Sequence, residues 1–129
     1  MMMMMMMMMM MMMIIDVPVP RAVVQLCYNQ LTGSIPTQLG NLTRLTVLAL
    51  QSNRLTGAIP ASLGGLPLLA RLDLSFNSLF GSIPVRLAQL PRLVALDVRN
   101  NSLTGSVPAG KSFSSSHPFV HPRELSYCS

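Results

Sequence analysis

The sequence has few of the residues that build metal and redox sites. It has no tryptophan, only two cysteines and two histidines among 129 residues, and only four acidic residues. Cys27 and Cys128 form no CxxC pair, so neither a zinc site nor a redox motif is supported. His117 and His121 each precede a proline, which opposes a regular helix, and few further ligands lie near them. We therefore expect no metal site, no cofactor and no cofactor-binding residues.

The charge pattern and the hydrophobic runs exclude two further classes of partner. The net charge of +5 comes from arginines scattered singly from Arg21 to Arg123, without a basic run or interleaved aromatics, so we expect no nucleic-acid partner. The longest apolar stretch, 1–15, ends at Asp16 and is shorter than a membrane span. We therefore expect no transmembrane helix and no membrane contact by this chain.

Both ends of the sequence differ from its middle. The first thirteen residues are all methionine, and no Lys or Arg precedes Arg21, so residues 1–21 are not a convincing signal peptide. We interpret them as a disordered or artefactual leader. Residues 109–129 contain four serines within 112–116 and then two His-Pro pairs in place of any regular pattern, which is typical of a loose terminal tail.

Residues 22–108 repeat one unit with a period of 24. The register is visible in the asparagines, glycines and leucines of successive units: Asn29, Asn53, Asn77 and Asn101; Gly33, Gly57, Gly81 and Gly105; Leu31, Leu55, Leu79 and Leu103. So many residues repeating with one period predict a solenoid, here of about three and a half repeats.

One unit shows why the repeat stacks. Leu48 and Leu50 alternate with outward-facing residues, which predicts a short strand with one buried face. The amide of Asn53 can both donate to and accept from the backbone of neighbouring turns, so stacked asparagines predict a structural ladder. Gly57 permits a left-handed turn and Pro60 fixes the next corner. Leucines at three-residue spacing then predict a 3-10 return.

The segments LTGSIP, LTGAIP, FGSIP and LTGSVP resemble the plant-type leucine-rich repeat, most of all the ectodomains of leucine-rich repeat receptor-like kinases. The resemblance implies an α/β solenoid. Its features would be a right-handed superhelix, a concave parallel β-sheet, a second short strand at each LtGxIP segment and 3-10 turns on the convex side.

The sequence also departs from that family. Its ectodomains carry an N-terminal cap with a cysteine pair, whereas Cys27 stands alone inside the first repeat. The fourth copy ends after Pro108, and no kinase motif is present, so we expect a non-enzymatic, truncated piece of a longer receptor. A disulfide between Cys27 and Cys128 is geometrically unfavourable if three repeats separate them.

The ends of this stack lack the polar capping repeats that solenoids use. Val24 and Leu26 at one end, and Leu93, Leu96 and Val98 at the other, would then present apolar faces to solvent. An exposed apolar face beside a strand edge favours association. We therefore expect the chain to self-associate end to end.

Solenoids bind partners through the concave strand positions between the buried leucines. The outward columns predict a mixed-charge patch with an aromatic beside it, and the candidate binding residues are Gln51, Arg71, Asp73, Ser75, Phe76, Asp97 and Arg99. Arginine and aromatic side chains are frequent in contact hot spots. Asp73 and Asp97 stack one repeat apart, but exposed carboxylates without a pocket seldom act as a catalytic pair. No catalytic residue is therefore expected.

The sequence leaves three functions open. The first is a module that binds a protein or peptide, such as a ligand or a co-receptor, within a receptor-like ectodomain. The alternatives are a non-functional gene remnant and a small secreted inhibitor resembling polygalacturonase-inhibiting proteins. Sequons at Asn41 and Asn100 predict N-glycosylation and fit a parent protein in the secretory pathway, at the cell surface or in the apoplast.

Overall fold

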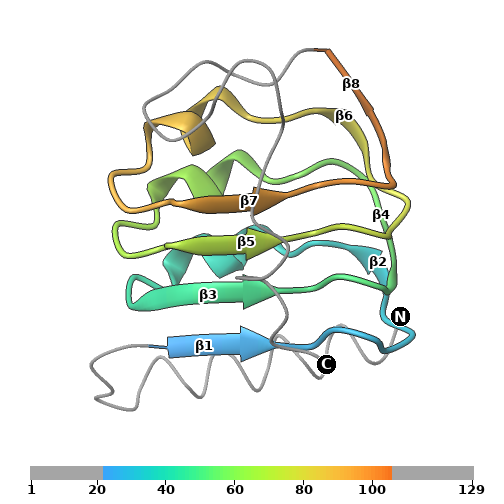
Figure 1. Cartoon of the computed structure of the whole chain (residues 1–129), viewed down its shortest axis with the longest axis horizontal. Coiled ribbons are helices and arrows are strands. Elements are labelled where there is room, and N and C mark those ends of the chain that lie inside the picture. The colour runs from blue at the N-terminus through green and yellow to red at the C-terminus, as the bar shows by residue number, and fades with distance from the viewer. Residues whose placement is uncertain (1–21, 106–129) are drawn as a thin grey trace.

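A computed structural model describes residues 22–105 of the chain (Figure 1). The leader 1–21 and the tail 109–129 lie outside the described residues, as do the two histidines and Cys128. The division of the chain into leader, repeats and tail therefore stays a prediction at its outer boundaries.

The main sheet has one strand from each repeat. Its strands are all parallel and lie in chain order: β1 (Ala22–Gln25), β3 (Leu45–Ala49), β5 (Arg71–Asp73) and β7 (Ala95–Asp97). The pairing follows the sequence repeat, because Leu48 lies opposite Leu72 and Leu72 opposite Leu96. The predicted parallel sheet is confirmed.

Short strands at the LtGxIP segments form a second layer. They are β2 (Thr32–Ser34), β4 (Arg54–Thr56), β6 (Phe80–Ser82) and β8 (Ser102–Thr104). β2 pairs with β4 and β6 with β8, all parallel, and a single bridge between Ala58 and Phe80 connects the two pairs. Figure 1 shows this layer running along one side of the main sheet.

The predicted 3-10 turns complete each repeat. They are η1 (Thr37–Asn41), η2 (Ala61–Gly65) and η3 (Val85–Gln89), and each begins after a proline with ψ between 132° and 134°. The turns stack closely: a Cβ placed on Gly40 would lie 2.7 Å from the Cβ of Ser62. Only glycine fits there without a shift of the neighbouring turn. In Figure 1 these turns lie behind the main sheet, on its convex side.

The core lies between the sheet and the 3-10 turns. It consists almost entirely of repeat leucines that are fully buried, among them Leu48, Leu63, Leu66, Leu72, Leu79 and Leu96. Each buried aliphatic side chain contributes about 1.5–3 kcal/mol. The same leucine is thus buried in every repeat, which explains why the period is so regular.

The asparagine side chains connect neighbouring repeats by hydrogen bonds. The Oδ1 of Asn77 accepts from the N–H of Leu55 at 3.0 Å, and its Nδ2 donates to the carbonyl of Leu50 at 3.0 Å in the preceding repeat. Asn53 and Asn101 make the same bonds one repeat away. These bonds form the ladder that the repeat predicts. Asn29, in the first repeat, is exposed, and among residues 22–105 it donates only within its own turn.

A left-handed turn precedes each ladder asparagine. The four residues at this position, all non-glycine, have φ between 55° and 58°: Tyr28, Ser52, Phe76 and Asn100. Such values are unusual for bulky side chains. Their recurrence in every described repeat makes the turn a property of the unit.

Two expectations about the ends of the stack are wrong. Val24, Leu93 and Leu96, expected to present apolar faces to solvent, are buried. Cys27 is disulfide-bonded, although the sequence made a bond with Cys128 geometrically unfavourable. Val98 is buried as well, and Leu26 is half-buried, so the apolar faces expected at the ends are largely absent.

Candidate binding face

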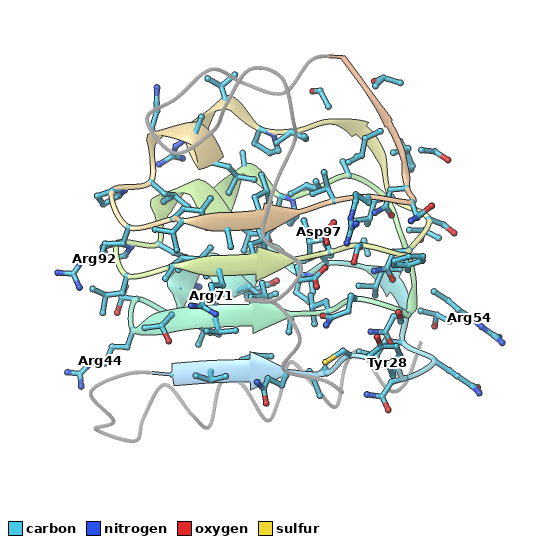
Figure 2. The ribbon with its side chains drawn as sticks, in the orientation of Figure 1. Tyr28, Arg44, Arg54, Arg71, Arg92 and Asp97 are labelled. Carbon is cyan, nitrogen blue, oxygen red and sulfur yellow. The ribbon has the colours of Figure 1, made fainter. Side chains whose placement is uncertain are left out.

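The candidate residues lie where the register predicts them, on the concave side of the main sheet. In β5 the side chain of Leu72 enters the core, so those of Arg71 and Asp73 lie on the opposite face. Asp73 lies opposite Asp97 in the pairing of β5 with β7. Figure 2 labels Arg71 and Asp97 on this face.

Four of the seven candidate residues are buried and Arg71 is half-buried, in contrast to the sequence prediction. Gln51, Asp73, Ser75 and Asp97 are all buried, and Asp97 is only 2 % exposed. The repeat register placed them correctly on the concave face. It carried no information about what covers that face.

Asp73 and Ser75 form a buried pair at the end of β5. The hydroxyl of Ser75 donates to Oδ1 of Asp73 at 2.6 Å, and the backbone N–H of Ser75 donates to the same oxygen at 3.0 Å. Burial raises the pKa of Asp73 above its ordinary value, and these two bonds offset part of the rise. The carboxylate of Asp97 raises this pKa further and Arg99 lowers it.

Asp97 and Arg99 form the equivalent pair one repeat later. The Nε of Arg99 donates to both carboxylate oxygens of Asp97, at 3.0 and 3.1 Å, and its Nη2 donates to Oδ2 at 2.7 Å. The hydrogen bond to Asp97 raises the pKa of Arg99 above its ordinary value. The Arg99 side chain is still 51 % exposed, so a fixed guanidinium lies at the surface of this face.

Phe76 lies beside Arg99 at the edge of the face. Its backbone N–H donates to the carbonyl of Arg99 at 2.9 Å, and the phenylalanine is 52 % exposed. The sequence did not select Tyr28 as a binding residue, yet it occupies the same repeat position and is exposed too. The 24-residue repeat already places Tyr28 and Phe76 at equivalent positions, so the sequence could have predicted it.

Among residues 22–105 no group of three or more side chains could hold a metal ion. In the same range, no helix has the length and apolar character that crossing a membrane requires. The carboxylates of Asp73 and Asp97 instead bond to side chains two residues later, Ser75 and Arg99.

The comparison with protein families gives a match over most of the described chain. The model of a leucine-rich repeat family matches residues 22–79 and 44–103. A comparison with curated protein sequences gives no match.

Three solved structures are similar to this chain. The BIR2 ectodomain from Arabidopsis thaliana is 38 % identical with a TM-score of 0.67, and the match covers 78 % of this chain and 57 % of that one. The Arabidopsis receptor kinase HAESA, solved with the peptide hormone IDA and the co-receptor SERK1, is 39 % identical with a TM-score of 0.64; the match covers 66 % and 14 %. A plant ice-binding protein is 38 % identical with a TM-score of 0.61, covering 64 % and 26 %.

Two facts limit what these similarities carry over. The chain spans only part of each of the three proteins, and no more than about a seventh of HAESA. The three also differ in what their names say they do, which is usual when one fold carries several functions. Function must therefore be argued from the face itself.

Proposed function

We propose that the concave face of this chain binds a protein or peptide. The chain belongs to the leucine-rich repeat family and is of its plant type. The chain would be one segment of a receptor-like ectodomain that recognises a ligand or a co-receptor. The HAESA complex supports this proposal, because a similar solenoid is present there with both kinds of partner.

The observation that carries the proposal is the exposed, prearranged guanidinium of Arg99. Asp97 holds it through Nε and Nη2, while Nη1 donates to none of the described residues. A fixed guanidinium binds carboxylates well because little side-chain entropy is lost. Phe76, exposed beside it, adds apolar area. We infer that the ligand segment offers an acidic group next to an apolar one.

Panning a random-sequence peptide library, displayed on phage, on the full chain tests this proposal. Enriched peptides are then synthesised and their Kd measured by fluorescence anisotropy. Arg99→Ala is expected to weaken binding at least about tenfold, as loss of a charged contact does. Phe76→Ala should weaken it by a smaller factor.

Arg86→Ala is the matched control, because Arg86 is also exposed but lies on η3 at the convex side. It should leave the Kd unchanged. Failure to enrich any peptide would contradict the proposal, as would equal effects of Arg99→Ala and Arg86→Ala.

The parent protein, in this proposal, passes through the secretory pathway to the cell surface or the apoplast. Asn41 and Asn100 are both exposed, as acceptors of a glycan must be. Asn41 ends η1 on the convex side, away from the concave face. A glycan there would leave that face accessible to a partner.

Self-association, which the sequence predicted, has lost its physical reason. Val24 and Leu93 at opposite ends of the stack are buried in the single chain. We therefore propose a monomer. Sedimentation velocity of the full chain at micromolar concentration is the test, and a concentration-dependent dimer would restore the earlier expectation.

A further inference from the structure

The left-handed turn after each main strand places two exposed aromatic side chains in line. Tyr28 in the first repeat is 67 % exposed, and Phe76 in the third is 52 % exposed. Ser52 and Asn100 occupy the same position in the second and fourth repeats. We name these four residues the rim column. Aromatic and small polar side chains alternate along it, and Figure 2 labels Tyr28 on the side where the main strands end.

The fold does not explain why this column holds two aromatic residues. A left-handed backbone favours glycine and asparagine and disfavours bulky side chains, so Asn100 suits the turn better than Tyr28 or Phe76. Neither aromatic ring belongs to the hydrophobic core of the described residues. Bulky side chains that are held in an unfavourable conformation outside the core are typical of contact sites. The two rings therefore indicate a surface that a partner covers.

Backbone hydrogen bonds fix the spacing of the rim column. The N–H of each of its first three members donates to a carbonyl of the next repeat at 2.9 or 3.0 Å: Tyr28 to Gln51, Ser52 to Ser75 and Phe76 to Arg99. Successive members are therefore one strand spacing apart, which puts about 9.6 Å between the Cα atoms of Tyr28 and Phe76. The φ angles of these two residues, 56° and 57°, are nearly equal, so both side chains leave the backbone in the same direction.

A polyproline II helix repeats at this distance. It has three residues per turn and rises about 3.1 Å per residue, so every third side chain lies on one side at intervals of about 9.3 Å. In a β-strand the side chains of one face recur at about 6.7 Å, and two turns of an α-helix rise about 10.8 Å. Both match the rim column less closely. Prolines three residues apart in a polyproline II segment can therefore lie on Tyr28 and Phe76 together.

We propose that the rim column docks a proline-containing segment of a partner protein in the polyproline II conformation. The segment runs along the stack, with prolines three residues apart on Tyr28 and Phe76 and an acidic residue at Arg99. Aromatic surfaces bind such segments because the polyproline II helix is preformed and loses little entropy on binding. The inference rests on the proposed function and deepens it by naming the sequence pattern and the conformation of the ligand segment.

Polar groups beside the column suit the same segment. The carbonyls of a polyproline II helix have no internal partner, so one of them can accept a hydrogen bond from the hydroxyl of the exposed Tyr28. The carbonyl of Arg99 accepts the N–H of Phe76, so Arg99 lies one strand spacing further along the stack. This distance corresponds to one or two residues of the helix, which puts the acidic residue that far beyond the second proline. Both acidic residues of the described chain, Asp73 and Asp97, are buried, so no exposed carboxylate of the described repeats repels the segment.

Fluorescence anisotropy of labelled synthetic peptides on the full chain tests the proposal. The matched peptide is Ala-Pro-Ala-Ala-Pro-Ala-Glu-Ala, and its reversed sequence covers the opposite chain direction. The control peptide, Ala-Ala-Pro-Ala-Pro-Ala-Glu-Ala, has the same composition but prolines only two residues apart, and it is also made in reverse. In one of the two directions the matched peptide should bind at least about tenfold more tightly than its control, because only its prolines reach both rings.

Two variants of the chain test the spacing itself. Tyr28→Ser removes one ring and should weaken binding of the matched peptide at least about tenfold, as truncation of an aromatic hot spot does. Adding Ser52→Tyr restores the number of aromatic residues but reduces their spacing to about 4.8 Å, so binding should stay weak. Phe80→Ser is the matched control, because Phe80 is 56 % exposed but lies in β6, outside the rim column. It should leave the Kd unchanged.

Three results would overturn the inference. They are equal Kd values for the matched and control peptides in both directions, tight binding of the matched peptide by the chain that carries both Tyr28→Ser and Ser52→Tyr, and a loss for Phe80→Ser as large as that for Tyr28→Ser. The peptide comparison uses the unchanged chain, so it decides the question even if a variant unfolds.

The same measurements separate this inference from the proposed function. Library peptides whose binding depends on Arg99 but not on Tyr28 would leave the proposed function standing and overturn the rim docking. A matched peptide that loses affinity with Tyr28→Ser, but is affected equally by Arg99→Ala and Arg86→Ala, would support docking at the rim and contradict the proposed function.

Discussion

The first and last strands of the main sheet occupy the same place in the repeat but differ in what covers them. Val23 in β1 is 54 % exposed, whereas Ala95 in β7 is 1 % exposed. Pairing through Val47 and Arg71 puts both in one column of the concave face. The repeat therefore determines on which face a side chain lies. Its burial depends on what packs over that face.

The largest expected effect comes from placing a charge at each end of this column. Ala95→Arg would bury a guanidinium beside Arg71 and should lower the free energy of unfolding by about 3 kcal/mol or more. Val23→Arg remains in solvent and should change it by less than about 0.5 kcal/mol. Urea titration measures both changes in the free energy of unfolding. Equal changes would show that the two ends of the column do not differ in burial.

A second comparison sets an inner repeat against the first. Asn77→Ala leaves the N–H of Leu55 and the carbonyl of Leu50 without their partner, so we expect a loss of about 2–3 kcal/mol. Among the described residues, Asn29→Ala removes only exposed bonds within one turn, and it should cost less than about 1 kcal/mol. A shift within about 0.3 kcal/mol for Asn77→Ala would show that the ladder does not stabilise the stack.

The buried end of the face should also make stability depend on pH. Burial raises the pKa of Asp73 above 3.8, so the folded chain holds this proton more tightly than the unfolded chain. The stability that this group contributes is fully present below pH 3.8 and is lost as the pH rises through the raised pKa. Asp73→Asn keeps an oxygen that accepts from Ser75 but cannot ionise.

Unfolding curves of the wild type and Asp73→Asn, measured from pH 3 upward, check this prediction. The variant should lose less stability than the wild type as the pH rises. Parallel curves would mean that Asp73 is solvated in the folded chain. The concave face would then not be covered at this residue.

The smallest effect on stability is expected from the two sequons. In a plant secretory host Asn41 should carry a glycan, seen as a mass that peptide N-glycosidase removes, because it is exposed at the end of η1. Asn100 should be modified less, since the sequon's Ser102 lies in β8 and donates its N–H to Leu79. Asn41→Gln should change stability by less than about 0.5 kcal/mol. Preferred glycosylation of Asn100 would contradict this order.

Most of the fold could be predicted from the sequence because the residues that determine it recur in every repeat. The ladder asparagines, the prolines before each 3-10 turn and the leucine spacing each belong to one structural role. The division of the second layer into two strand pairs was not predictable in this way. It occurs between β4 and β6, where Phe80 replaces the threonine found in the other repeats.

The candidate face could be predicted only in part. The register placed Asp73, Asp97 and Arg99 together, but it could not show the burial of the two carboxylates or the ion pair that fixes Arg99. Burial depends on what packs over the face, and an ion pair depends on rotamers. Neither burial nor ion pairing repeats along the sequence, so a sequence pattern cannot predict them.

Methyl NMR in the presence of a soluble paramagnetic agent tests the central difference most directly. The Val23 and Ala95 methyl groups belong to the same column, and the experiment needs no substitution. The Val23 methyl signals should broaden strongly, while that of Ala95 stays sharp. Equal broadening of Val23 and Ala95 in the oxidised chain would contradict a concave face that is covered at its last strand.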